Sequence, residues 1–336
     1  VTINQDNSGA NAKQSINVFA FSDTKIVGGG GAIGLSTGEN LGAGAGADGG
    51  QIFKTTEAWL SAGVAHAANV VAVQAYSDEQ LVSFAGAIEL SQQSSELAGA
   101  LGVYVWNVTT QAYIGSESGD IGSATMPATT MPATTVPATT VHSGGSVLLA
   151  ANNDTTVTYI TGAVAFTLSG QGSAGGAVTV NDLTGHTRAY ISDDAQVTAL
   201  AGDQTDTIAA AVGGYDITFP EDGGDDDTSV APPGSVPSAV TGDGDVNADD
   251  PAWTHTREAT GNYTDVRGVA VTSNVTETIK GFSVAASVAK SVSADIGVFV
   301  PVSTRESRAW IGGTVNLGEN DVTETGQDVV VTASTD

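Results

Sequence analysis

An internal repeat limits the possible folds of this chain more than any other feature of its sequence. The segment INVFAFSDTKIVGGGGAIGLS, which starts at Ile16, aligns with VAVQAYSDEQLVSFAGAIELS, which starts at Val71. The two copies share Ser-Asp, Gly-Ala-Ile and Leu-Ser at matching positions. Self-similarity of this kind is typical of solenoids and other repeat architectures, in which each unit packs on its neighbours.

The end of the unit recurs four times as the pattern [TS]-x-A-[YW]-[IL], with its aromatic residue at Trp59, Tyr113, Tyr190 and Trp310. We expect these aromatics to stack at one corner of the fold or to cap each unit. The alternative is that they form a platform for a ligand.

The start of the unit recurs weakly from Val197 and from Val269, and DVVVTASTD restarts it, with Ala333 corresponding to Ala75. The chain is therefore expected to begin and stop inside a repeat array. Val329 to Val331 give the last segment an apolar, strand-forming end, and open solenoid ends seek strand partners. We expect end-to-end association, either with copies of the chain or with further repeats of a longer parent.

Short alternating segments rich in Val, Ile and Thr, separated by Gly, Asn, Asp and Ser clusters, predict an all-β fold. A unit of about 55 residues is short for an immunoglobulin-like sandwich. We therefore predict a parallel β-solenoid (β-helix) built from degenerate repeats of about 55 residues, with loop insertions and roughly 20 residues per coil. This places Phe21 and Tyr76 two or three coils apart.

Two biased segments divide the repeats. MPATTMPATTVPATT lies in a Pro/Thr-rich stretch at 124–141, which predicts an extended surface excursion. An acidic Pro/Gly-rich insertion is expected at 219–256. The predicted solenoid repeats then cover 1–123, 142–218 and 257–336.

Two enzymatic spacings overlap in the first copy. Gly29, Gly31 and Gly34 fit G-x-G-x-x-G, and Gly34, Ser36 and Gly38 fit G-x-S-x-G. Both motifs need a strand-to-helix junction, and the second copy keeps the serine but lacks the glycines. We interpret the glycines as tight corners between short strands and expect no catalytic residue here.

Composition excludes several functions. Thirty-seven acidic residues against ten basic ones give a formal charge of −27, which repels nucleic acid and anionic membranes. The chain has no cysteine for a disulfide or thiolate site, and no apolar run long enough to span a membrane as a helix. We expect neither nucleic-acid binding nor membrane insertion.

Catalytic patterns are also missing, because the four histidines are scattered and none belongs to a metal pair such as H-E-x-x-H. The alternative to a non-catalytic protein is a carbohydrate-active β-helix enzyme, a polysaccharide lyase or tailspike-like depolymerase, with paired carboxylates on one face.

One acidic segment resembles the start of a calcium loop. DGDVNADD places Asp243, Asp245, Asn247 and Asp249 at alternate positions, as oxygen ligands are in such loops. The match is partial, since Ala248 stands where the loop has Gly and Thr254 where it has a bidentate acid. We predict calcium at these four residues, and the alternative is a solvated acidic loop.

The repeats that carry VAVQAYSD, AGALGVYVWNVTTQAYIG and AGGAVTVNDLTGHTRAYIS resemble those of giant bacterial surface proteins, the leukotoxin-type filamentous adhesins. The resemblance covers about half of the chain, most clearly from Ile16 to Gly119. It implies a β-solenoid stalk exposed outside the bacterial cell surface, with a role in adhesion or filament building. Host-surface or matrix glycans are the partners it suggests, and it implies no catalytic residue.

Overall fold

The computed structural model describes residues 2–4, 11–38, 41–61, 63–117, 139–169, 172–201, 207–218, 258–318 and 326–336. Of these residues, 83% lie in β-strands and none lies in a helix. The prediction of an all-β chain is confirmed.

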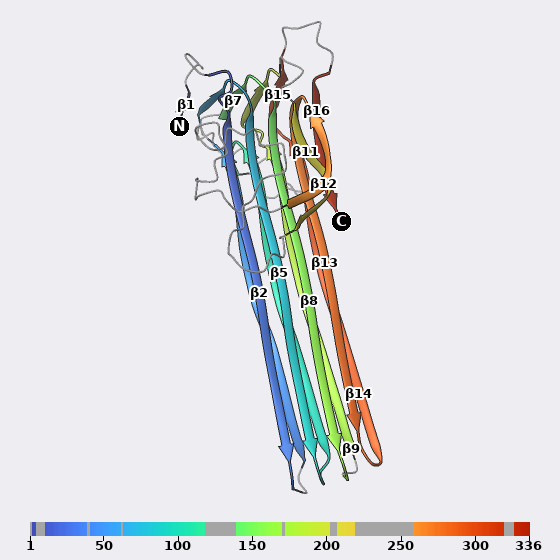
Figure 1. The fold of residues 1–336 in the computed structure, drawn as a ribbon. Helices are drawn as coiled ribbons and strands as arrows, with labels where there is room; N and C mark the ends of the chain where they lie inside the picture. The colour runs from blue at the N-terminus through green and yellow to red at the C-terminus, as the bar shows by residue number, and fades with distance from the viewer. Residues whose placement is uncertain are drawn as a thin grey trace, which may run out of the picture.

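The strands form three parallel sheets and one antiparallel hairpin (Figure 1). Sheet I contains the short strands β1 (Thr2–Ile3), β4 (Val64–Ala67), β7 (Thr139–Ser143), β10 (Ala195–Ala199) and β15 (Thr314–Leu317), in this order. Sheet II contains β2 (Ile16–Ser36), β5 (Val71–Ser91), β8 (Val147–Thr167), β13 (Gly268–Val288) and β16 (Asp328–Thr335). Sheet III contains β3 (Gly42–Leu60), β6 (Glu96–Ile114), β9 (Gly172–Ile191) and β14 (Val292–Ile311). The hairpin pairs β11 (Ile208–Thr218) with β12 (Glu258–Val266).

The chain passes through the three sheets in a fixed order, from sheet II to sheet III to sheet I, and then returns to sheet II beside its earlier strand. We call one such passage a coil. The strands of successive coils pair in parallel, and this path is consistent with a β-helix or solenoid-like fold.

Each sequence repeat makes one whole coil, so the prediction of two or three shorter coils per repeat is wrong. Phe21 pairs directly with Tyr76 in the adjacent strand, rather than lying two or three coils away. The sequence was misleading because each coil contains two strands of 19 to 21 residues, about four times the usual strand length of five to six residues.

The register tests the weaker recurrences. Val269 aligns with Val147 and Val71, and Ala333 aligns through Ser273 and Ala151 with Ala75, as predicted. The recurrence predicted from Val197 is wrong, because Val197 lies in β10 of sheet I and pairs with Val141.

Two connections are much longer than the others. The first, between β6 and β7, contains most of the predicted Pro/Thr-rich excursion, and only its last residues, Thr139 to Val141, are described, as part of β7. The second, between β10 and β13, contains the hairpin, whose strands bracket the predicted acidic insertion. The insertion itself lies outside the described residues.

The upper half of the molecule, the end that contains sheet I in Figure 1, has an ordinary aliphatic core. Val71 of sheet II, Ala112 of sheet III and Val141 of sheet I belong to one buried cluster. The hairpin covers the outer face of sheet II at this level, where Tyr263 and Ala211 pack with Tyr76.

In the lower half, which we call the blade, sheets II and III lie against each other without sheet I (Figure 1). Large side chains fill the upper part of this interface, namely Leu81, Tyr104, Trp106, Val157, Tyr159 and Leu183. In the lower part the buried apolar side chains are alanines, namely Ala85, Ala87, Ala98, Ala100, Ala163, Ala165 and Ala177. A Cβ atom at Gly30 would overlap the carbonyl oxygen of Ala47, and one at Gly46 would overlap that of Gly86. Gly28 to Gly31 and Gly34 therefore lie inside strand β2, where Gly30 permits close approach of the sheets, and the prediction that they mark corners is wrong.

Candidate functional site

The serine of the G-x-S-x-G spacing is the last residue of β2 and pairs in register with Ser91 of β5. Its side-chain oxygen accepts a hydrogen bond from Ser94 Oγ at 3.2 Å. The histidines in the described part of the chain lie elsewhere, in β4, β7 and β9. The structure thus brings no histidine to Ser36 within the residues it describes.

The four repeat-end aromatics form one continuous stack, as the sequence predicted. Ring centroids are 6.2 Å apart for Trp59 and Tyr113, 5.0 Å for Tyr113 and Tyr190, and 4.3 Å for Tyr190 and Trp310, with the ring planes within 13° of parallel. Tyr190 is fully buried and Tyr113 is 6% exposed, whereas Trp59 is 49% exposed. The inner rings therefore connect the coils, and the terminal Trp59 offers a broad open face.

A charged cluster lies beside this stack on sheet III. Glu306 Oε2 is 2.8 Å from His186 Nδ1 and 3.5 Å from an Arg188 guanidinium nitrogen, and Glu306 Oε1 pairs with Arg308. Burial alone would raise the pKa of Glu306, but the His186 hydrogen bond and the two arginines hold it below its ordinary value. The cluster is not visible in the sequence, because His186 and Glu306 lie 120 residues apart and meet only through the strand register.

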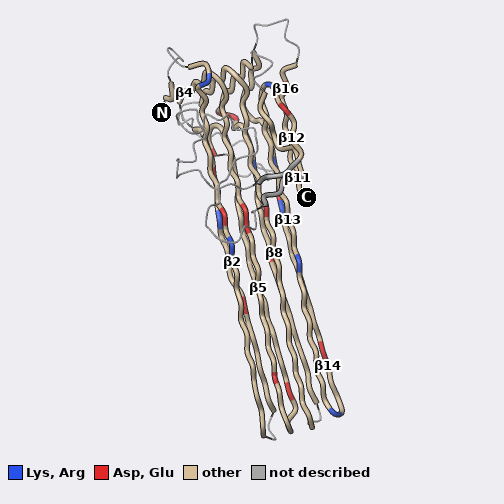
Figure 2. The backbone as a smooth tube through the Cα atoms, in the orientation of Figure 1, with Lys and Arg blue, Asp and Glu red and all other residues tan. Residues whose placement is uncertain are grey.

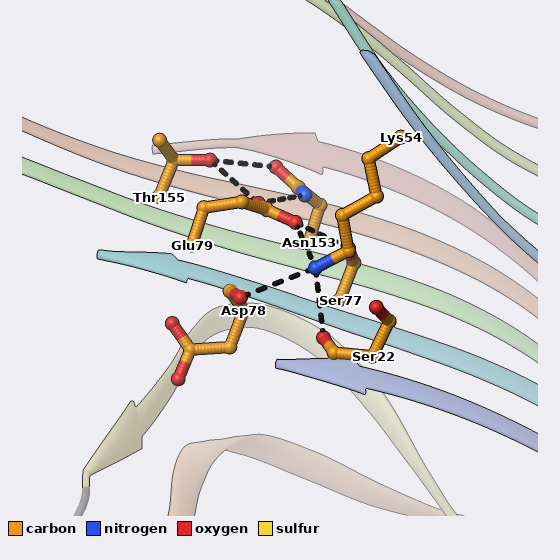
Figure 3. A network of polar contacts seen from close by, with 7 residues as sticks. All are labelled: Ser22, Lys54, Ser77, Asp78, Glu79, Asn153 and Thr155. Carbon is orange, nitrogen blue, oxygen red and sulfur yellow. Dashed lines mark hydrogen bonds and ion pairs between the residues drawn. The ribbon is translucent and has the colours of Figure 1, made fainter. Parts of the chain in front are cut away.

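A buried ion pair lies between the sheets where the upper half meets the blade. Lys54 Nζ is 2.8 Å from Glu79 Oε1, and the Glu79 side chain is fully buried (Figure 3). Lys54 also donates to the carbonyl oxygens of Ser22 and Asp78, at 3.0 and 3.3 Å.

The other oxygen of Glu79 is held by the next coil. Asn153 Nδ2 and Thr155 Oγ1 donate to Glu79 Oε2 at 2.8 and 3.1 Å (Figure 3). Ser77 donates to Oε1. These donors satisfy the Glu79 carboxyl group without water, and the network links three strands of sheet II to sheet III.

A second pair occupies the same register position, two coils further along for the glutamate and three coils further along for the basic residue. Glu277 aligns through Thr155 with Glu79, and Arg305 aligns through Gly185 and Val108 with Lys54. Arg305 Nη2 and Nε donate to Glu277 Oε1 at 2.8 and 2.9 Å. A Cβ atom at Gly185 would overlap the Arg305 guanidinium, so the glycine leaves the space that this side chain fills.

Two further carboxyl groups lie inside the bottom of the blade. Glu89 and Glu96 are each 2% exposed, and Ser94 donates to Glu96 Oε1 at 2.8 Å. Burial, and next the neighbouring Glu96, raise the pKa of Glu89 above its ordinary value. A Cβ at Gly34 would overlap the Glu89 carboxyl group, so a small residue in the first coil is required there.

The strands at both ends of the coil stack have open edges. Within the described residues, β2 and β3 each pair with one neighbour only, as do β14 and, below Val275, β13. At the upper end β16 covers β13 only from Gly268 to Val275. The described array thus presents long unpaired strand edges at both of its ends.

The predicted calcium ligands Asp243, Asp245, Asn247 and Asp249 lie outside the described residues. Within those that are described, no group of three or more His, Asp or Glu side chains is placed to hold a metal ion. Nor does that part of the chain contain a helix that is long and apolar enough to cross a membrane.

In comparisons with known proteins, no protein-family model, no curated protein and no solved structure matches this chain.

Proposed function

We propose that this chain is a non-catalytic structural segment of an extracellular bacterial surface adhesin or filament, and that it assembles end to end as a parallel β-solenoid. The observation that carries the proposal is the pair of open ends. An unpaired strand edge displays a row of backbone N–H and C=O groups that another strand satisfies by pairing with it.

The length of these edges supports assembly rather than capping. β2 offers 21 residues and β3 offers 19 at one end, and β14 offers 20 at the other. Natural proteins protect edges with inward-pointing charges, prolines or short strands. β2 contains no proline, and its charged residues, Asp23 and Lys25, lie at exposed positions. β14 contains one proline, Pro301, which removes a single backbone donor, and two inward-pointing charged residues, Asp295 and Arg305. β3 also carries the inward-pointing Lys54, so β2 is the least protected of the edge strands.

The partly occupied edge of β13 restricts how the array continues. β16 already pairs with Gly268 to Val275, so an added strand pairs with the part of β13 from Thr276 to Val288. A further repeat in register supplies such a strand as a continuation of β16. A strand from a separate copy of the chain can pair with this part of β13 only if it avoids β16, which occupies the upper part of the same edge.

A non-catalytic role is supported by where the close carboxyl pair lies. Glu89 and Glu96 are enclosed between the sheets, where a polysaccharide chain has no access. The alternative, a carbohydrate-active enzyme, requires such a pair in an open cleft.

The resemblance to filamentous adhesins suggests adhesion to host or matrix glycans, and Trp59 is a suitable contact residue for them. Trp59 is half exposed at the open end of the aromatic stack, where its indole ring offers an apolar face with a polar N–H edge. The charged cluster around Glu306 lies on the same sheet, nearer its other end. The calcium site at Asp243, Asp245, Asn247 and Asp249 is part of the same proposal, as a stabiliser of the acidic insertion.

End-to-end assembly is tested by placing a charge inside the open end. Ile26 of β2 packs against the interior cluster, so the substitution Ile26→Lys puts an ammonium group where an added coil would bury it. In the isolated chain this lysine reaches water through the open end. We expect Ile26→Lys to abolish growth of linear assemblies in electron microscopy and light scattering.

The matched control is Val27→Lys, which adds the same charge at the next residue, on the exposed outer face. It should assemble end to end like the unmodified chain. The proposal is wrong if the unmodified chain stays monomeric at high concentration with its β2 amides protected from hydrogen exchange, or if both lysine variants assemble equally well.

A further inference from the structure

The lower part of the blade, below the buried cluster of Trp106 and Tyr159, carries its large apolar side chains on the outside. Along β5, the outward positions include Val82, Phe84, Ile88 and Leu90, while the inward positions hold Ser83, Ala85, Ala87 and Glu89. Phe84, Ile88 and Leu90 are 38 to 44% exposed although β5 lies between two other long strands. Their exposure is therefore a property of the face and does not arise from the open ends.

On sheet II these side chains line up across the strands as ridges that run along the coil stack. The lower ridge contains the rows Ile33, Ile88, Val164 and Leu35, Leu90, Phe166, Val288. Above it, Gly31, Gly86 and Gly162 form a flat row over β2, β5 and β8, which ends at the exposed Val284 of β13. A Cβ at Gly86 would meet no atom within 4 Å, so this row is open.

Sheet III presents a groove on the opposite outer face of the blade. Its small residues include Ala43, Ala45, Gly99, Ala174, Gly176 and Ala294, with Leu97 and Ile296 among them, and its volume is about 460 Å³. The groove crosses all four strands, so it runs in the same direction as the ridges of sheet II.

The ridge and the groove lie at the same height on the blade. Ile88 precedes the end of β5, at Ser91, by three residues, and Gly99 follows the start of β6, at Glu96, by three residues. If a second molecule has the same orientation and is displaced perpendicular to the sheets, its sheet II ridge therefore faces the sheet III groove of the first molecule. Packed sheets lie about 10 Å apart, and side chains of the two faces interdigitate in this way.

Charge does not oppose this contact. At the outward positions of sheet II from the level of Val27 to that of Leu35, the charged side chain among the described residues is Lys280. The outward rows of sheet III that start at Ala43, Ala45, Ala47 and Gly49 hold none.

The acidic groups of the lower blade belong to its interior positions. Figure 2 shows the blade almost free of charged residues over most of its length, and Glu89 and Glu96 near its lower end are buried. Asp295, at the β14 end of the groove, points inward, because its Oδ1 lies 3.0 Å from where a Cβ on the inward-facing Gly175 would be.

The area is sufficient for a specific contact. Four strands about 4.8 Å apart and nine residues at about 3.3 Å each give a face of roughly 570 Å². Two such faces bury roughly 1,100 Å² in total, which is close to the lower limit for stable protein interfaces.

We propose that the blade is a lateral docking surface for a second copy of this chain, with the sheet II ridge of one molecule seated in the sheet III groove of the next. The contact joins two different faces, so each added molecule leaves one ridge and one groove free, and the array is open. This lateral contact is independent of the strand edges used in the end-to-end proposal.

The decisive variant fills the groove without making it less apolar. A Cβ at Gly99 would meet no atom within 4 Å, so Gly99→Leu fits the folded chain and occupies the groove. Non-specific hydrophobic association would increase with this variant, whereas ridge-in-groove packing would weaken. We expect Gly99→Leu to lower lateral association at least tenfold in sedimentation and small-angle X-ray scattering.

A second variant removes the ridge. Ile88→Lys with Val164→Lys should also abolish lateral association, while Asn107→Lys, an exposed site on sheet III above the groove, should leave it intact. All of these variants should retain end-to-end growth, and Ile26→Lys should retain lateral association, so the two proposals fail separately. Hydrogen exchange of the interior amides checks that each variant is folded.

Three results would overturn the lateral proposal. One is a chain that shows no lateral association at any concentration in the Ile26→Lys background. Another is a Gly99→Leu variant that associates as strongly as the unmodified chain. The third is a chain that stays dispersed in buffer but floats with neutral phosphatidylcholine vesicles, which would assign the apolar faces to lipid.

Discussion

Lys54 and Arg305 occupy the same register position in the first and last coils of sheet III, and each pairs with a glutamate of sheet II. In the two coils between them, sheet III has Val108 and Gly185 at this position. In sheet II, Asn153 and Thr155 donate hydrogen bonds to Glu79. Replacement of a buried ion pair by apolar residues is often harmless, whereas removal of one partner leaves an uncompensated charge. The pair at each end is therefore a point of high sensitivity to single substitutions.

Removal of the Lys54 ammonium should destabilise the fold strongly. Lys54→Met leaves Glu79 buried with its other donors, so we expect a loss near the lower limit for broken buried pairs, about 3 kcal/mol. Lys25→Met, at an exposed position of β2, should change the free energy of unfolding by less than about 0.5 kcal/mol. Chemical denaturation measures both, and the pair is structurally unimportant if the two variants unfold alike. The double variant Lys54→Met/Glu79→Gln should recover part of the loss.

Glu89 gives the fold a pH dependence of predictable sign. Its folded-state pKa is raised above the ordinary value of 4.5, so the folded chain holds this proton more tightly than the unfolded chain. The contribution of this proton to the free energy of unfolding is fully present below pH 4.5. It is lost as the pH rises through the folded-state pKa of Glu89. Glu89→Gln should therefore stabilise the chain at neutral pH, and the gain should vanish at acidic pH.

Thermal melts of Glu89→Gln and the unmodified chain between pH 4 and pH 8 check this prediction. Asp182→Asn, at an exposed position of β9, controls for the loss of one negative charge. A constant difference between Glu89→Gln and the unmodified chain over the whole range would contradict it.

At the scale of the strands, alternation predicted the all-β class correctly. The alternating small residues of AGALGV and AGGAVTV also indicate a narrow interior, and Ala98, Ala100, Gly175 and Ala177 do point inward. In β5, the residues that an amphipathic strand normally buries, such as Phe84 and Ile88, point outward, and Ser83 and Glu89 point inward. The period of two in β5 does not show that its polar residues point inward, because this depends on the close approach of sheet III. Glu79, Glu89 and Lys54 were not predicted as interior groups for the same reason.

Insertions limited what the repeat could reveal. The first two coils start at Ile16 and Val71 with no long connection between them, so their similarity is visible in the sequence. The recurring pattern at the end of the unit likewise predicted the aromatic stack. The next coils start at Val147 and Val269, which are further apart in the sequence because long connections intervene between their strands. A search at one period therefore identifies the first pair of coils and misses the third, whose start, VLLAAN, shares few residues with VAVQAY.

The two central glycines of β2 provide a matched test of close sheet packing. Gly30 points inward, where a Cβ would overlap the Ala47 carbonyl oxygen, and Gly29 points outward, where a Cβ would come no closer than 3.9 Å to Phe84. We expect Gly30→Ala to cost about 1–3 kcal/mol because it pushes the two backbones apart. Gly29→Ala should be neutral or stabilising by up to about 1 kcal/mol, since alanine lowers the entropy of the unfolded chain. Equal stability of the two variants in urea unfolding would exclude this packing.

At the scale of the whole molecule, charge is unevenly distributed. The chain carries −27, yet the described outer faces of the blade are nearly uncharged. The blade itself therefore contributes little electrostatic repulsion between neighbouring copies. This distribution lets the blades of two copies approach one another.

Calcium should stabilise the chain if Asp243, Asp245, Asn247 and Asp249 form the predicted site. At a calcium concentration a hundredfold above the dissociation constant, the gain is about 2.7 kcal/mol. Asp243→Asn with Asp245→Asn should remove the calcium-dependent rise in melting temperature, whereas Asp182→Asn with Glu117→Gln, which neutralises two charges elsewhere, should keep it. Identical melting curves in calcium and in chelator for the unmodified chain would show that no such site exists.

The direction of the long strands has a consequence for what such an array builds. Each coil of about 55 residues advances the stack by one strand spacing, about 4.8 Å, while its strands of 19 to 21 residues reach about 65 Å across it. On the order of a thousand residues then make a ribbon roughly 90 Å long and nearly as wide, with strands perpendicular to its growth. Such a chain extends only a short distance along its growth axis for its number of residues, and it has two wide faces. Growth of the stack therefore lengthens a flat two-faced ribbon and does not extend a thin thread.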